Sequence, residues 1–176
     1  IVGGGFMKIF PFLGIWGIRL LGAIVSTGTI AIAFNLLKKY LHNGWLKLSL
    51  IMLSLFINED AKNLYYNNLS AFLYFVSAYF LFVGIRDKKK LFLLAAGFFI
   101  GLNVFSRLPN LLGAGMILSI FYYGYLTRER LKDLLIRSCF FLLGILAAFL
   151  LVYLSMKSLH QLTYFIESVK IISASS

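Results

Sequence analysis

The chain has 176 residues, of which 61% are hydrophobic and 13% are charged, and its mean hydropathy is +0.90. A soluble domain would carry about 25% charged residues, so this composition excludes a water-soluble globular protein and indicates an integral membrane protein surrounded by a lipid bilayer. The net charge of +11 does not indicate a nucleic-acid partner, because the basic residues stand in short loops between apolar runs rather than on one continuous face.

Six apolar segments are candidates for membrane-spanning helices, each of which needs about 20 residues. They cover residues 20–37, 45–57, 69–85, 91–105, 111–126 and 138–156. The second segment is short, which fits a tilted or partly inserted helix. None shows the period-2 alternation of barrel strands, and a helix satisfies its own backbone groups in lipid, so helices are predicted throughout.

Two further segments flank these candidates. Residues 6–18 predict either an interfacial helix or an upstream extension of the first span, and residues 159–172 predict another surface-lying helix. The predicted fold is therefore an all-α, polytopic transmembrane bundle of about six spanning helices plus interfacial helices. The chain lacks an initiator Met, so we expect residues 1–176 to be a single transmembrane domain and a fragment of a longer membrane protein.

The basic residues predict how the bundle is oriented. If all six segments span, eleven of the 17 Lys and Arg residues fall on one side. Cytoplasmic loops are enriched in Lys and Arg, so we expect this side to face the cytoplasm, in the inner (plasma) membrane of a bacterium. The residues concerned are Lys38, Lys39, Lys47, Arg86, Lys88, Lys89, Lys90, Arg128, Arg130, Lys132 and Arg137.

Arg107 is the first candidate for a functional residue on the non-cytoplasmic side. It stands between the fourth and fifth predicted helices, just before Pro109. A guanidinium at the start of a helix can bind a phosphate with two hydrogen bonds, and the helix N-terminus adds a favourable dipole and free N–H groups. An arginine at a membrane boundary can also extend to the lipid headgroups, and the sequence leaves both interpretations open.

Adjacent carboxylates and further polar residues accompany Arg107 on this side. Glu59 and Asp60 could act as a general base or bind a divalent cation, the one cofactor that the sequence suggests, although a solvated turn also explains them. Tyr66 is expected in an interfacial aromatic belt or in contact with a sugar or lipid. Arg19 is expected to reach the headgroups or to pair with Glu59 or Asp60. No His or Cys spacing predicts a metal site.

Small residues predict where helices pack closely. Gly97 and Gly101 form a Gly-x-x-x-Gly pattern in the fourth segment, and Gly113 and Gly115 act similarly in the fifth. Cys139 opens the last segment, and we expect a buried, unreactive thiol.

Three stretches resemble a known family. Residues 94–109, LAAGFFIGLNVFSRLP, are similar to the Gly-x-x-x-Gly-Leu … Arg/Lys-x-Pro helix ending of GT-C type integral-membrane glycosyltransferases, the relatives of protein O-mannosyltransferases and lipid A aminoarabinose transferases. Residues 13–23, LGIWGIRLLGA, resemble that family's entry into an early helix. Residues 65–72, YYNNLSAF, resemble the segment before a later helix, where the family often has an Asp and this chain has Asn67 and Asn68.

The resemblance implies transfer of a sugar from a polyprenyl-phosphate carrier to an acceptor outside the cytoplasm. It assigns phosphate or substrate binding to Arg107, Arg19, Tyr66 and Asn67, and an assisting acidic or metal-binding role to Glu59 and Asp60. The family's main catalytic acid is expected upstream of Ile1. The alternative is a non-catalytic multi-pass protein, such as a transporter subunit or assembly factor, although the nearly charge-free helix centres argue against an ion path.

Overall fold

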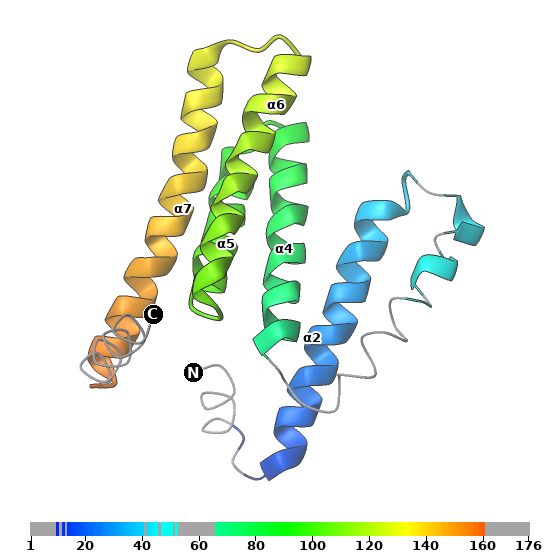
Figure 1. Ribbon diagram of the computed structural model, residues 1–176, viewed down its shortest axis with the longest axis vertical. Coiled ribbons are helices and arrows are strands. Elements are labelled where there is room, and N and C mark those ends of the chain that lie inside the picture. Colours follow the sequence, from blue (N-terminus) through cyan, green and yellow to red (C-terminus); the bar gives the residue numbers. More distant parts are fainter. Residues whose placement is uncertain are drawn as a thin grey trace.

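The computed structural model describes residues 10, 12, 14–40, 42–45, 47–50, 52 and 66–160. These residues form a bundle of helices that run up and down alongside one another (Figure 1). Within the described ranges no strand occurs, as the sequence predicts. The elements are α2 (Gly14–Leu37), α4 (Tyr66–Arg86), α5 (Lys90–Val104), the 3-10 helix η2 (Leu108–Ile117), α6 (Leu118–Leu126) and α7 (Leu131–Ser158).

Three of the described helices have the length and apolar composition needed to cross a membrane. They are Arg19–Leu37, Asn67–Arg86 and Leu131–Ser158. The apolar helix α5 has only 15 residues, so it reaches ~22 Å at about 1.5 Å per residue, short of the ~30 Å hydrocarbon core. The first, third, fourth and sixth predicted segments are thus confirmed as helices, and the first extends upstream to Gly14.

The fifth predicted segment is helical but not uniform. Its first part is η2, ten residues of 3-10 helix, and its second part is the nine-residue α6. A 3-10 helix rises about 2.0 Å per residue, so the two together reach ~33 Å and can cross the hydrocarbon core. The second predicted span, 45–57, and the flanking segment 159–172 lie largely outside the described residues, so the predicted six spans are not established. In the other flanking segment, 6–18, residues 14–18 belong to α2 and so form the predicted upstream extension of the first span.

The chain direction alternates along the bundle. The α4–α5 turn and the α6–α7 turn lie at the upper end in Figure 1, and the C-terminus of α2 points the same way. We call this the basic end, because Lys38, Lys39 and the basic residues of both turns lie there. One of its acids is paired locally: Arg86 Nε donates to Asp87 Oδ1 at 2.6 Å, which holds the pKa of Asp87 below its ordinary value.

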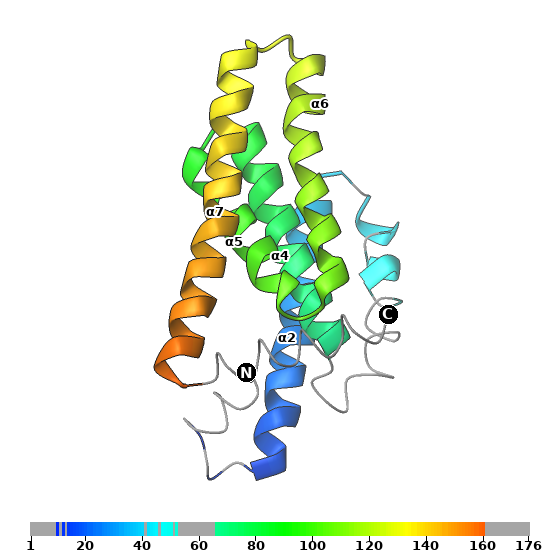
Figure 2. The ribbon, with the colours of Figure 1, turned by 60° about the vertical axis from the view of Figure 1, so that its left-hand side comes forward.

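Helix α5 lies at the centre of the bundle, between α4 and α7 (Figure 2). A Cβ atom added at Gly97 would collide with the carbonyl oxygen of Phe141 on α7, and one added at Gly144 would collide with that of Leu94 on α5. The predicted close approach at the Gly-x-x-x-Gly pattern is therefore confirmed. The core around this crossing comprises Leu81, Ile85, Leu93, Ala96, Ile100, Ile120, Leu134 and Phe141.

The predictions for Gly115 and Cys139 are wrong, and the prediction for Gly113 is confirmed. A Cβ atom added at Gly115 would meet nothing within 4 Å, so, contrary to the prediction, Gly115 does not contribute to close packing. Gly113 is tightly packed against Tyr74, as predicted. Cys139 is exposed on α7, and the prediction of a buried thiol is wrong. The sequence shows that a helix is apolar, but only the packing decides which face of it turns inward.

Candidate functional site

A group of polar side chains gathers at the end of the bundle opposite the basic end. We call it the polar cluster, and it combines residues of α4, of α5, of η2 and of the turn between α5 and η2. Its members are buried or half-buried except for Asn67 and Arg107, which are exposed. They are Asn67, Asn68, Ser70, Tyr74, Asn103, Arg107 and Asn110.

Asn110 is the centre of the polar cluster. Its Nδ2 donates to Ser70 Oγ at 2.8 Å and also lies 3.1 Å from both the backbone oxygen and Oδ1 of Asn103. The hydroxyl of Tyr74 donates to the Asn110 carbonyl oxygen at 3.2 Å. Buried polar groups are stable in an apolar bundle only when they are hydrogen-bonded, so Asn110 fixes the start of η2 against α4 and α5.

Arg107 is held at the edge of this network. It has an extended backbone, with φ −154° and ψ 130°, and forms the N-cap of η2. Pro109 stands in the first turn, where its missing N–H has no helical partner to lose. The Asn110 N–H donates to the Arg107 carbonyl oxygen at 3.0 Å, and Arg107 Nη1 donates to Asn67 Oδ1 at 3.3 Å. The guanidinium is therefore positioned from both α4 and η2.

The cluster contains more hydrogen-bond donors than it uses internally. The amide nitrogens of Asn68 and Asn103 are buried and have no partner among the residues that the structure describes. The N-termini of α4 and η2 both lie here, and a helix N-terminus offers free N–H groups and a partial positive charge. Together with the exposed guanidinium, this arrangement favours an anion over a cation.

The structure brings together two of the predicted phosphate-binding residues, Arg107 and Asn67. Arg19 is exposed on α2, and its guanidinium carbon lies 5.2 Å from the centre of the Trp16 ring. Tyr66 begins α4, but its side chain is not among those that the structure describes. The predicted acidic pair Glu59 and Asp60, with its suggested cation, also lies outside the described residues.

Sequence reasoning missed four members of the cluster: Ser70, Tyr74, Asn103 and Asn110. A signal for two of them was present, because Asn67, Ser70 and Tyr74 follow the i, i+3, i+7 spacing of one helix face. Asn103 and Asn110 flank the Arg107 turn and become neighbours only because that turn reverses the chain. Among the described residues, no group of three or more His, Cys, Asp or Glu side chains could hold a metal ion.

Comparison with known proteins gives one family. A model of the dolichyl-phosphate-mannose-protein mannosyltransferase family matches residues 3–165. No curated protein and no solved structure matches the chain significantly. The matched range includes every helix from α2 to α7 and confirms the resemblance to GT-C type membrane glycosyltransferases. The chain is an integral membrane protein that belongs to the dolichyl-phosphate-mannose-protein mannosyltransferase family.

Proposed function

We propose that this chain forms the phosphate-binding part of a membrane glycosyltransferase that uses a polyprenyl-phosphate sugar donor. The sugar is transferred to an acceptor on the non-cytoplasmic side of the bacterial inner membrane. The observation that carries this proposal is the contact between Arg107 and Asn67, at the place where η2 and α4 begin. Membership of a mannosyltransferase family supports sugar transfer in general.

The chemistry of the reaction explains why a guanidinium is needed. When the sugar leaves its carrier, negative charge develops on the phosphate, and fixed donors that stabilise this charge lower the barrier. Arg107 supplies a permanent positive charge with donors that match phosphate oxygens. Asn67 holds this guanidinium in place through a hydrogen bond of 3.3 Å, so little side-chain freedom is lost when the phosphate binds.

The position in the bundle suits a lipid-linked donor. Arg107 and Leu108 are exposed at the end of a short apolar helix, where a phosphate at the membrane boundary can meet them while its prenyl tail stays in the hydrocarbon. The basic end lies at the opposite side of the bundle, and the excess of Lys and Arg there favours a cytoplasmic orientation. The polar cluster then faces away from the cytoplasm.

The remaining predicted site residues complete the proposal. Glu59 or Asp60 assists the acceptor as a general base or as a ligand of a divalent cation, and Tyr66 contacts the sugar or lipid. Arg19 leaves its contact with the Trp16 ring and places a second positive charge near the phosphate. These roles rest on residue type and on the family, and the contact between Arg107 and Asn67 is independent of them.

The test is transfer of a radiolabelled sugar from polyprenyl phosphate in membranes that contain the full-length protein. Arg107→Ala removes a charged hydrogen-bond donor to the phosphate, which is worth about 1.5–3 kcal/mol. We expect kcat/KM to fall roughly tenfold to a hundredfold. Arg107→Lys keeps the charge but loses the planar donor pair, so it should recover only part of the activity.

Lys157→Ala is the matched control. Lys157 is an exposed cation in the last turn of α7, toward the same end of the bundle, and it takes no part in the hydrogen bonds described for the polar cluster. We expect this variant to keep wild-type activity. If Arg107→Ala is as active as Lys157→Ala at equal membrane insertion, Arg107 only contacts headgroups and the proposed phosphate site is wrong.

A further inference from the structure

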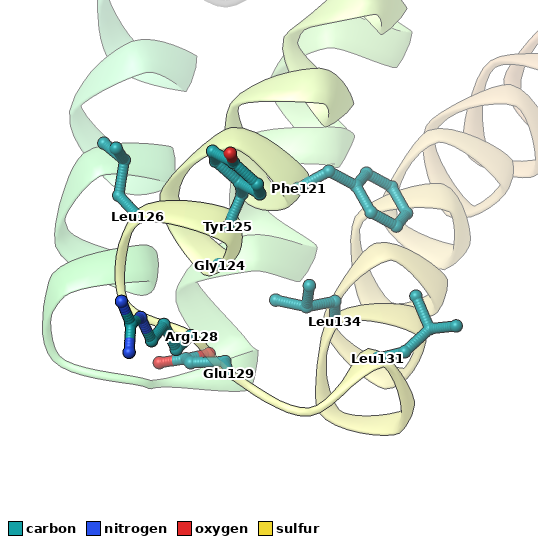
Figure 3. A pocket seen from close by; sticks show the side chains of 8 residues that line it. All are labelled: Phe121, Gly124, Tyr125, Leu126, Arg128, Glu129, Leu131 and Leu134. Carbon is teal, nitrogen blue, oxygen red and sulfur yellow. The ribbon is translucent and has the colours of Figure 1, made fainter.

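A cavity opens at the basic end, far from the polar cluster, between α6 and α7 (Figure 3). Its volume is about 570 Å³, within the ~300–1,000 Å³ typical of small-molecule sites. Its walls combine apolar and aromatic side chains from both helices, including Phe121, Leu131 and Leu134. Arg128 and Glu129, from the turn between the helices, supply its charged groups.

The backbone at Arg128 has an unusual conformation. Helix α6 ends with Arg128 N–H donating to the Tyr125 carbonyl at 3.3 Å and Glu129 N–H donating to the Gly124 carbonyl at 2.9 Å. This is a Schellman cap, which requires a left-handed residue that is usually Gly. Arg128 occupies that position with φ 52°, at a cost that a glycine would avoid.

The α4–α5 turn repeats the same cap. Three described residues other than glycine are left-handed, and each follows the end of a helix: Lys88, Arg128 and His160. Lys88 has φ 55°, and the next N–H, that of Lys89, donates to the Gly84 carbonyl at 3.1 Å. The Lys88 ammonium lies 3.1 Å from Glu129 Oε1, so this left-handed lysine makes an ion pair within the protein. Among the residues that the structure describes, Arg128 makes no such pair. Strained residues without an internal role are associated with functional sites.

The electrostatics of the cavity favour an anion despite the carboxylate in its wall. The Glu129 side chain is 9% exposed and is paired on both oxygens, with Lys88 at 3.1 Å and with the buried Arg137 at 2.9 Å. This three-residue group therefore carries one net positive charge, and Arg128 adds a second. Arg130 is exposed nearby and raises the local positive potential further, whereas the exposed Lys132 stands beside the exposed Asp133 and the two together carry no net charge.

The surroundings of the cavity are suited to a hydrocarbon chain. Tyr125, Leu126 and Leu131 are 78%, 60% and 64% exposed, and Tyr122 and Leu135 continue the same outward apolar surface along α6 and α7. In a membrane protein these faces meet lipid. A cationic pocket between two membrane helices, next to an apolar surface, is typical of sites for anionic lipid headgroups.

We propose that this cavity binds an anionic phospholipid from the membrane leaflet at the basic end. Arg128 contacts the phosphate, the residues between α6 and α7 surround the headgroup, and the acyl chains lie along the exposed leucines. This site differs from the proposed donor site, because it lies at the opposite end of the bundle and contains none of the polar cluster. Arg128 is one of the residues that line the cavity (Figure 3).

The experiment measures binding of phosphatidylglycerol to the purified full-length protein in neutral detergent, by the rise in its melting temperature. Phosphatidylcholine and inorganic phosphate serve as the other two ligands. We expect phosphatidylglycerol alone to stabilise the wild type. Arg128→Gly should weaken its apparent affinity roughly fivefold, the effect of about one basic residue at an anionic lipid. The same variant relieves the backbone strain, so the lipid-free melting temperature should not fall.

Lys132→Gln is the matched control, because it removes a charge from the same end without touching the cavity. We expect it to bind phosphatidylglycerol as the wild type does. An equal loss in both variants would mean general surface attraction and would overturn the proposal, as would equal stabilisation by phosphatidylcholine or inorganic phosphate. If Arg128→Gly does not fold, Arg128→Asn also suits a left-handed cap, and wild-type affinity in that variant would overturn the proposal too.

Discussion

Replacing Gly97 by alanine tests whether the α5–α7 crossing holds the bundle together. The added Cβ would collide with the carbonyl oxygen of Phe141, and its next neighbours are the Phe141 carbonyl carbon and the Ile145 backbone nitrogen at 3.2 Å. All three are backbone atoms, so no side-chain rotation can make room. The two helices must therefore separate. The contact between Gly101 and Ala148, which lies at the same α5–α7 crossing, must loosen as well.

Overpacking of this kind costs about 1–3 kcal/mol, and we expect the upper part of that range because the obstacle is backbone. For a protein of this length, ~3 kcal/mol corresponds to a melting temperature lower by roughly 6–12 °C. Helix propensity acts in the opposite direction, since alanine is favoured over glycine by about 1 kcal/mol in a helix interior, so the net cost is about 2 kcal/mol and the expected fall is roughly 4–8 °C. The measurement is thermal unfolding of the purified protein in detergent, followed by intrinsic tryptophan fluorescence.

Gly115→Ala is the matched control for this substitution. A Cβ at Gly115 meets no atom within 4 Å, so the same chemical change should leave the melting temperature unchanged or raise it slightly. If Gly97→Ala melts within about 2 °C of Gly115→Ala, a difference well below the predicted shift, the crossing tolerates a side chain and the explanation given for Gly97 is refuted.

Two further predictions concern buried polar contacts. Ser77→Ala removes the hydrogen bond of 2.9 Å that the fully buried Ser77 hydroxyl donates to a carbonyl of α5, and it should lower the unfolding free energy by about 0.6 kcal/mol, at most ~1.7. Exposed Ser119→Ala should have no effect in the same unfolding assay, and an equal loss there would contradict the assignment. Glu129→Gln leaves the buried Arg137 without its counter-charge and should cost about 3–5 kcal/mol. Denaturant titration would measure this, and a loss below ~1 kcal/mol would show that Arg137 reaches water instead.

Much of the fold follows from local properties of the sequence. The helices α4, α5 and α7 begin and end within a few residues of the predicted apolar segments, apart from the start of α7, because apolar length and charged ends are local features. Helix α7 begins seven residues before its predicted start, since the segment from Leu131 to Arg137 contains three charged residues and was therefore assigned to a loop. The long 3-10 stretch of η2 was not foreseen; within it Gly113 packs against Tyr74 of α4, a contact between helices that the sequence does not reveal.

The candidate site was predictable only in part. Arg107 was recognised from its place between two helices and before Pro109, which are sequence features. Its hydrogen bond to Asn67 joins residues 40 positions apart, and the Asn110 contact with Ser70 spans the same separation. Such pairs form only when α4, α5 and η2 pack, and the distance along the chain does not reveal them.

The sequence by itself determined that this protein is helical and membrane-embedded, and that its basic residues gather in alternate loops. Each of these follows from composition and short-range spacing, since lipid excludes unpaired backbone groups and apolar length sets a span. Only the tertiary structure decided which acceptor holds the Arg107 guanidinium, which carbonyl excludes a side chain at Gly97, and which cations neutralise Glu129. These contacts join different helices, and their geometry is fixed by how closely the helices pack rather than by any single segment.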